Sequence, residues 1–149
     1  MIDILRSIGL ITRITTSDGN QLFKNMGLNN NQFIYVIRVS ENPGIIQSEL
    51  ADLIHIDHST SLRTIQKLER SGFIERRKDA VNKKIRRVYP TAQALSVYPL
   101  LHEYESDSAS HAVLGLSSVE QKLLNDLLFK VVKNVLNKPA TDKLFLKND

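Results

Sequence analysis

Leu68-Glu69-Arg70-Ser71-Gly72-Phe73-Ile74-Glu75-Arg76 is the stretch that decides the fold, because it ends a helix and begins a strand within nine residues. Apolar residues recur at i, i+3 and i+6, which predicts an amphipathic helix from about residue 60 to Ser71 with a core-facing stripe of Leu62, Ile65 and Leu68. Gly72 suits the left-handed position that follows a helix. The helix is therefore expected to stop at Ser71-Gly72, and a strand is expected to follow over residues 73–77.

A hairpin is predicted directly after this helix. Residues 73–77 and 85–89 read as two short strands, joined by the polar and basic segment Lys78-Asp79-Ala80-Val81-Asn82-Lys83-Lys84. This connection is long for a plain hairpin. Pro90-Thr91 is expected to end the second strand and cap a fifth helix, which Pro99 should break or kink.

Helical periodicity also dominates the residues before the deciding stretch. A first helix is expected from about residue 4 to Lys24. Asn29-Asn30-Asn31-Gln32 predicts an Asn N-cap with Gln at N3, opening a second helix whose inner side carries Phe33, Val36, Ile37 and Ser40. After the turn residues 41–44 and the apolar pair Ile45-Ile46, a short third helix is expected, and Asp57 should cap the fourth.

The last predicted helix starts at a full capping box, Ser117-Ser118-Val119-Glu120. Its apolar face is wider than one surface helix needs and consists of Leu123, Leu124, Leu127, Leu128, Val131, Val132, Val135 and Leu136. The pattern alone fits two interpretations equally well: packing against a second subunit, or packing against the chain's own core.

The order of these elements is that of a winged helix-turn-helix. We therefore expect a mainly α fold with a small two- to three-stranded antiparallel wing. The helix at about residues 60–71 could lie in a DNA major groove with Ser59, Thr60, Arg63 and Lys67 facing outward, while the hairpin loop contacts the adjacent backbone or minor groove.

The charge distribution supports a polyanion-binding surface. The 149 residues carry a formal net charge of +4, yet residues 63–87 hold ten Lys or Arg and only three acids, a net charge of +7. A charge run is more often a solvated face. Here it coincides with the predicted helix and hairpin, which favours nucleic acid as the partner.

Composition excludes several other classes of function. With no cysteine, the chain cannot form disulfides, thiolate zinc sites, iron–sulfur clusters or a thiol redox sensor. Four histidines lack metal-ligand spacing, and no nucleophile elbow or phosphate-binding glycine loop occurs, so we expect no metal, no cofactor and no enzymatic activity. An acid near the start argues against an export signal, and a cytoplasmic protein is expected.

Ser48-Glu49-Leu50-Ala51, the pair Thr60 and Arg63, and the stretch 68–76 resemble the core signature of the MarR family of transcriptional regulators, close to its SlyA-like branch. The resemblance extends over almost the whole chain. It implies a single MarR-type domain over residues 1–149, with the winged helix-turn-helix at about 29–91 and dimerisation helices at about 1–25 and 91–138. It further implies a homodimer that binds a pseudo-palindromic duplex and usually represses transcription.

The resemblance also implies site residues. Arg63 matches the family's base-contacting arginine. The family has Asp-x-Arg in the wing where this chain has Asn82-Lys83-Lys84, so either Lys84 or Arg86 would replace the usual wing arginine. The expected DNA-binding residues are Gln47, Ser48, His58, Ser59, Thr60, Arg63, Lys67, Arg77, Lys83, Lys84 and Arg86.

Members of this family often bind small aromatic or anionic effectors. A cleft for such an effector could be lined by Arg13, Phe33, Tyr35, Arg38 and Tyr98, although each of these is individually more typical of a core or surface residue. An alternative function is a winged-helix module that docks a protein partner without specific DNA binding, and the +7 segment argues against it.

Overall fold

The computed structural model of the chain describes residues 2–138, which fall into two compact units divided at Ser108. The elements in chain order are α1 (Ile2–Leu22), the short 3-10 helix η1 (Lys24–Met26), α2 (Gln32–Glu41), β1 (Ile45–Ile46), α3 (Gln47–Ile54), α4 (His58–Arg70), β2 (Ile74–Lys78), β3 (Arg86–Pro90), α5 (Ala92–Ala112) and α6 (Ser118–Leu136). The first unit ends within α5, and the second unit contains the end of α5 and all of α6.

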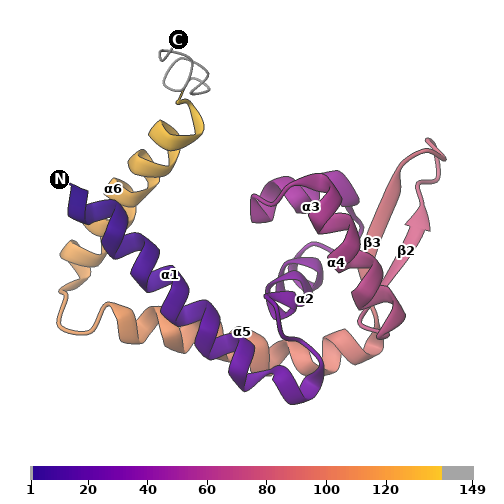
Figure 1. Ribbon diagram of the computed structural model, residues 1–149, viewed down its shortest axis with the longest axis horizontal. Coiled ribbons are helices and arrows are strands. Elements are labelled where there is room, and N and C mark those ends of the chain that lie inside the picture. The colour runs from indigo at the N-terminus through magenta and orange to yellow at the C-terminus, as the bar shows by residue number, and fades with distance from the viewer. Residues whose placement is uncertain (1, 139–149) are drawn as a thin grey trace, which may run out of the picture. The chain divides into compact units, whose positions relative to one another are not determined.

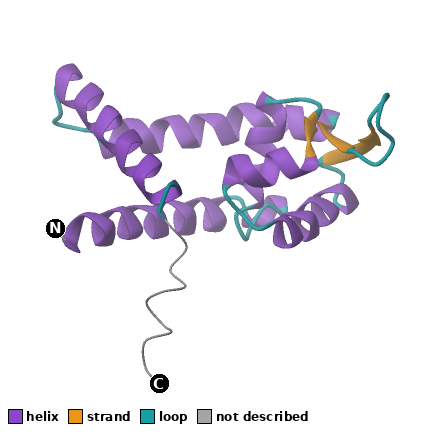
Figure 2. Ribbon diagram, turned by 90° about the horizontal axis from the view of Figure 1, so that it is seen from above, coloured by secondary structure: helices purple, strands orange, loops and turns teal. Residues whose placement is uncertain are grey.

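The first unit is a winged helix-turn-helix, as predicted. Its strands form an antiparallel sheet in the order β1-β3-β2, and the loop between β2 and β3 extends away from the helices (Figure 1; Figure 2). The apolar pair Ile45-Ile46, for which the sequence predicts no element, is the third strand, and Ile45 pairs with Val88 and Ile46 with Arg87. The wing strands begin and end one residue later than predicted.

One apolar cluster holds the helices and the sheet of the first unit together. It contains Val36 and Ile37 of α2, Leu50 of α3, Ile65 of α4 and Val88 of β3, all fully buried. Burial of such side chains contributes roughly 1.5–3 kcal/mol each relative to leaving them exposed. The sheet and the helix-turn-helix therefore share one core, so the wing is fixed relative to α4.

An aromatic cluster joins α5 to the N-terminal helices of the same unit. Phe23 packs against Phe33 and Tyr104, with ring centroids 5.4 and 5.3 Å apart. The Tyr104 hydroxyl donates a hydrogen bond of 2.6 Å to the backbone oxygen of Thr15 in α1. Gly19 permits this packing, because a Cβ there would lie only 2.5 Å from Cζ of Phe33.

The predicted N-cap of α2 is wrong. The helix begins at Gln32, its N-cap is Asn31 in the left-handed region (φ 65°), and no side chain caps it. Asn31 is held instead by Asn20 of α1, whose Oδ1 accepts from the Asn31 backbone nitrogen at 2.7 Å. A tertiary contact with α1 therefore replaces the local capping box that the Asn-rich stretch predicted.

Three further details differ from the predictions. Leu62 is only partly buried, and the buried stripe of α4 is Ser61, Ile65 and Leu68. Pro99 does not break α5, which continues from Ala92 to Ala112. The first helix also ends slightly earlier than predicted, at Leu22, before the 3-10 turn.

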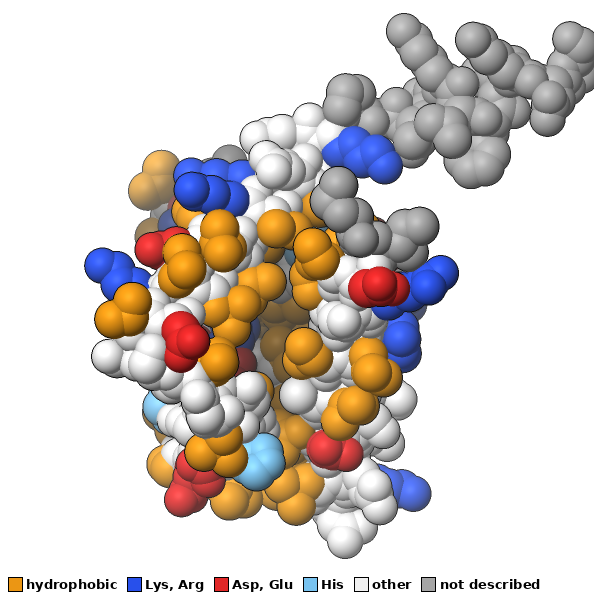
Figure 3. All heavy atoms as spheres, turned by 90° about the vertical axis from the view of Figure 1, so that its left-hand side faces the viewer, with side chains coloured by type: hydrophobic (Ala, Val, Ile, Leu, Met, Phe, Trp, Pro, Cys, Tyr) orange, Lys and Arg blue, Asp and Glu red, His pale blue; other side chains and the backbone are white. Residues whose placement is uncertain are grey.

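The second unit is dominated by α6, which begins at the predicted capping box. Ser117 Oγ accepts from the Glu120 backbone nitrogen at 3.3 Å, and Glu120 Oε2 accepts from the Ser117 nitrogen at 2.8 Å. No residue of α6 is buried in this single chain. Large hydrophobic side chains of α6, among them Leu127, Val132 and Val135, are exposed in the single chain. Figure 3 shows hydrophobic side chains gathered on one face of the molecule.

Within residues 2–138, no helix is long and apolar enough to cross a membrane.

Candidate nucleic-acid interface

The exposed side of α4 is organised by Asp57, the predicted N-cap. Asp57 Oδ1 accepts from the Thr60 backbone nitrogen at 2.9 Å and from the Ser59 hydroxyl at 2.8 Å. These hydrogen bonds, chiefly those with Thr60, lower the pKa of Asp57 to about 2, so the carboxylate is charged at neutral pH. Ser59, Thr60, Arg63 and Lys67 are all exposed, as the helical periodicity predicted.

The two helices of the helix-turn-helix are also connected at the surface. His58, the first residue of α4, places its Nε2 2.8 Å from Oδ1 of Asp52 in α3. His58 also lines a surface hollow of about 230 Å³ together with Gln47, Ser48, Ser59 and Leu62. Four of the five lining residues are predicted DNA-binding residues, and Leu62 borders the hollow instead of facing the core.

A second connection joins α4 to the wing. The Glu69 carboxylate accepts from the backbone nitrogen, Nε and Nη2 of Arg76, at 3.2, 2.9 and 2.7 Å. These bonds from the Arg76 side chain are the main reason that the pKa of Glu69 lies below its usual value. Arg76 also reaches Gln47 Oε1 of α3 at 3.5 Å, so one arginine bridges α3, α4 and β2.

The basic segment contains two populations of cations. Each of its three acids pairs with one arginine: Glu69 with Arg76, Glu75 with Arg77, and Asp79 with Arg87. The other seven basic side chains have no ion pair within residues 2–138, and they are Arg63, Lys67, Arg70, Lys78, Lys83, Lys84 and Arg86. The net charge of +7 is therefore carried by side chains that remain available to an anionic partner.

The strand register places the basic side chains of β2 and β3 on two different faces of the wing. Residues opposite each other share a face, so Lys78 and Arg86 lie on the face that carries the buried Val88 and is turned toward the helices. Arg77 lies opposite Arg87 on the other face, where its guanidinium stacks over the Tyr89 ring at 4.5 Å. Arg77 is therefore on the far side of the wing from α4.

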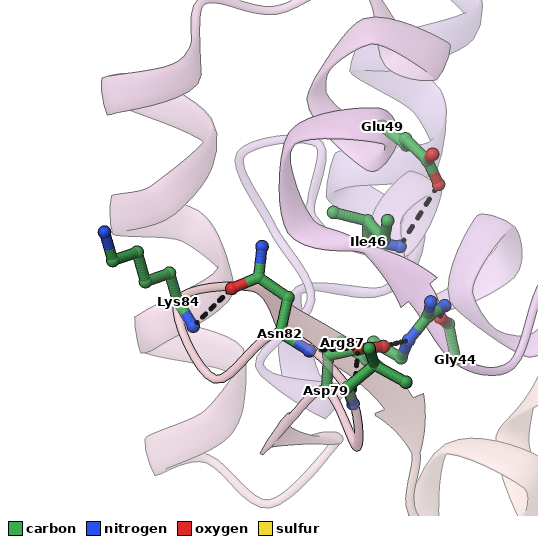
Figure 4. A network of polar contacts seen from close by, with 8 residues as sticks. Gly44, Ile46, Glu49, Asp79, Asn82, Lys84 and Arg87 are labelled. Atoms are coloured by element: carbon green, nitrogen blue, oxygen red, sulfur yellow. Dashed lines mark hydrogen bonds and ion pairs between the residues drawn. The ribbon is translucent and has the colours of Figure 1, made fainter.

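Lys84 and Arg86 meet the beginning of α3. They line a hollow of about 220 Å³ with Ile46, Gln47, Ser48 and Ile85. Glu49 Oε2 accepts from the Ile46 backbone nitrogen at 3.4 Å at this helix start (Figure 4). Lys78, on the same face, has no ion pair within residues 2–138. It is not among the DNA-binding residues predicted from the sequence, although strand alternation with Arg86 could have identified it.

The five residues proposed for an effector cleft lie in different surroundings. Phe33 and Tyr35 are buried in the core, and Arg13 is exposed on α1. Arg38 bonds to Glu41 at 3.1 Å and makes a bidentate ion pair with Glu105 of α5. Tyr98 lies near this group, where burial and the two carboxylates raise its pKa. The effector cleft stays a prediction.

In the described part of the chain, no three His, Cys, Asp or Glu side chains are grouped so that they could hold a metal ion.

We predict that Asp57→Ala lowers the midpoint of thermal unfolding by about 2–5 °C, because the Thr60 backbone amide and the Ser59 hydroxyl at the start of α4 lose their acceptor. Asp57→Asn keeps an acceptor and should stay close to the wild type. The folded pKa is depressed from 3.8 to about 2, so the charged carboxylate's contribution is complete above pH 4 and is lost as pH falls toward 2. Calorimetry from pH 2 to 8 tests this, and a difference between wild type and Asp57→Ala that persists unchanged at pH 2 would contradict it.

Comparison with known proteins identifies the family. The profile of the MarR family matches residues 28–85. The HTH-type transcriptional regulator YybA of Bacillus subtilis (strain 168), itself uncharacterized, is 44% identical over 135 residues, which cover 91% of this chain and 90% of that protein.

Two solved structures have the same fold over most of their length. The transcriptional regulator SlyA superposes with a TM-score of 0.86 at 47% identity, covering 89% of this chain and 94% of that one. A MarR family transcriptional regulator of Listeria monocytogenes, crystallised with a 26mer DNA, superposes with a TM-score of 0.86 at 40% identity, covering 91% of this chain and 90% of that one. The chain therefore belongs to the MarR family of helix-turn-helix transcriptional regulators, which bind DNA and are not enzymes.

Proposed function

We propose that this regulator is a homodimer that recognises a specific pseudo-palindromic DNA duplex and represses transcription by occupying a promoter. The observation that carries the proposal is the set of seven unpaired cations, which lie on α4 and on the wing next to it. A surface of this charge attracts the phosphate backbone through release of counterions. Cytoplasmic action on DNA follows from the same proposal.

Arg63 is our candidate for base recognition. It is exposed on the outer side of α4, one turn after the helix start, and its Nη2 donates to Thr60 Oγ1 at 3.3 Å. This contact holds the guanidinium along the exposed side of the helix. A guanidinium in the major groove can donate two hydrogen bonds to O6 and N7 of guanine. Ser59, Thr60 and Lys67 flank it and would assist.

For the wing we propose that Lys84 and Arg86 act together. Both line the hollow at the start of α3, and the Gln47 and Ser48 side chains complete it. A phosphate there would meet two cations and the positive end of the α3 dipole. This arrangement favours contacts to the DNA backbone, which add affinity for every sequence, over readout of particular bases.

The homodimer is supported by the exposed apolar face of α6. Leu127 and Leu128 are 48% and 39% exposed, and Val132 and Val135 are 50% and 58% exposed. An apolar helix face of this extent is costly in water unless another surface covers it. A second copy of the chain is the occupant implied by the family, and a two-fold dimer would match a pseudo-palindromic site.

The experiment that tests specific binding is a fluorescence-anisotropy titration of a duplex from the gene's own upstream region and of a scrambled duplex, at several salt concentrations. We expect a preference of about 10³-fold for the upstream duplex and a steep negative salt slope. Arg63→Ala should cost about 1–3 kcal/mol on the upstream duplex and far less on the scrambled one. Equal losses on both duplexes would refute base readout by Arg63, and no binding at low salt would favour the protein-docking alternative.

The division of the wing into two faces gives a second prediction. Arg86→Ala should lower the slope of log K against log salt concentration by about 1, because one phosphate contact is lost. Arg77→Ala removes the same charge from the wing but should leave the slope unchanged, because Arg77 faces away and pairs with Glu75. The same titration measures both variants, and equal reductions would contradict the assignment of the two faces.

Dimerisation through α6 gives a third prediction. Leu127→Glu places a carboxylate in the apolar face and should raise the dimer dissociation constant by on the order of 100-fold or more. Lys122→Gln changes the net charge by the same amount on the polar side of α6 and should leave the dimer intact. Sedimentation equilibrium measures the proportions of monomer and dimer for the wild type and both variants. A wild-type chain that is monomeric at micromolar concentration would rule out the homodimer.

A further inference from the structure

We propose that Asp79 is a positioning residue for DNA binding, because it holds the loop between β2 and β3 in the conformation that presents Lys83 and Lys84. This inference rests on the proposed DNA-binding function. Asp79 itself does not contact DNA in this proposal; it acts through the backbone of the loop and through Arg87.

The Asp79 carboxylate closes the loop on itself. Its Oδ2 accepts from the backbone nitrogens of Val81 and Asn82, at 3.0 and 2.9 Å. The loop ends are joined by Asp79 N to Ile85 O at 3.0 Å, and Ile85 N bonds back to Asn82 O at 3.0 Å. Asn82 Oδ1 then accepts from the Lys84 nitrogen at 3.1 Å (Figure 4). The backbone on both sides of Lys83 is therefore held by hydrogen bonds.

The same carboxylate connects the loop to the helix-turn-helix. Its Oδ1 accepts from Arg87 Nε, and Arg87 Nη1 donates to the Gly44 carbonyl oxygen at 2.8 Å. Gly44 lies in the turn before β1 and α3, with φ at 84°, and its nitrogen bonds to Val88 O at 2.8 Å. A continuous chain of contacts therefore runs from the loop tip to the segment that leads into α3 (Figure 4).

Asp79 carries a negative charge within a surface proposed to bind negatively charged phosphates. Its side chain is only 12% exposed, and hydrogen bonds from Asn82, followed by Arg87 and Val81, lower its pKa to about 2. A carboxylate near DNA opposes binding by its charge. The hydrogen bonds that Asp79 accepts in the loop offset this repulsion, because a loop that is ordered before binding loses less conformational entropy on binding.

Glu75 provides a matched control on the same face of the wing. It also pairs with one arginine, Arg77, through two bonds of 2.9 Å. The Glu75 side chain is more exposed, at 54%, and within residues 2–138 it pairs with Arg77, two residues away on its own strand. Removing either acid deletes one negative charge and releases one arginine, but only Asp79 holds backbone amides of the loop.

The experiment compares Asp79→Ala with Glu75→Ala in the full chain, by anisotropy titration on the upstream and scrambled duplexes over a range of salt concentrations. Charge alone predicts that both variants bind more tightly. We expect Glu75→Ala to bind as tightly as the wild type or more tightly. Asp79→Ala should instead bind on the order of tenfold more weakly, with a salt slope reduced by about 1–2, because Lys83 and Lys84 are no longer held toward the phosphates.

A second pair of variants and a direct probe of the loop complete the test. Arg87→Gln and Arg77→Gln each remove one paired cation from the same face, and only Arg87→Gln should weaken binding strongly. Amide hydrogen exchange at Val81 and Asn82 should accelerate in Asp79→Ala and not in Glu75→Ala. Equal changes in affinity within each pair would overturn the inference while leaving the proposed function intact. A wild type that binds neither duplex would overturn both.

Discussion

The bond between Glu69 and Arg76 across the Ser71-Gly72 turn is the constraint on which the proposed DNA-binding surface depends. One carboxylate at the end of α4 receives three donors from the third residue of β2. Gly72, with φ at 84°, allows the chain to leave the helix at the angle that brings the two residues together. The Thr91 hydroxyl, 2.6 Å from Gly72 O, then fixes the start of α5 to the same turn. The Ser71-Gly72 turn therefore fixes the positions of α4, the wing and the start of α5 relative to one another.

This constraint explains why a basic surface contains acids at all. Glu69 and Asp79 are the acids of this segment that bond to backbone amides as well as to an arginine; Glu69 lies at the end of α4 before β2, and Asp79 directly follows β2. Arginine suits these pairings because its planar fork can donate several hydrogen bonds in fixed directions. Four of the seven unpaired cations are lysines, whose compact charge suits contacts with phosphate and does not require one fixed geometry. In residues 63–87, the acid–arginine pairs thus hold the shape of the surface, while the unpaired cations supply the proposed affinity for DNA.

Sequence reasoning succeeded where the determinant was local and failed where it was tertiary. The Asp57 cap, the Gly72 stop and the Ser117 capping box were predicted because each involves residues within a few positions of one another. The Asn29 cap was wrong because Asn20, eleven residues before Asn31, offers a competing partner. The position of Arg77 depends on strand register, and the bond from Arg87 to Gly44 spans 43 residues. Neither is visible in a hydropathy or charge pattern.

An ordered wing with lysines at its tip also implies how binding energy would be divided between the two proposed DNA contacts, those of the wing and those of α4. Lysine is a hydrated point charge and reads a narrow minor groove less well than arginine, so Lys83 and Lys84 contribute little discrimination between sequences. Their contribution is affinity, and affinity from flexible side chains is largest when the backbone beneath them is already ordered. In the proposed complex, base discrimination then falls mainly to Arg63, whose helix is held by the Asp57 cap at one end and by Glu69 and Arg76 at the other. A change in the wing should therefore alter how tightly the regulator binds DNA, while a change at Arg63 should alter which DNA it binds.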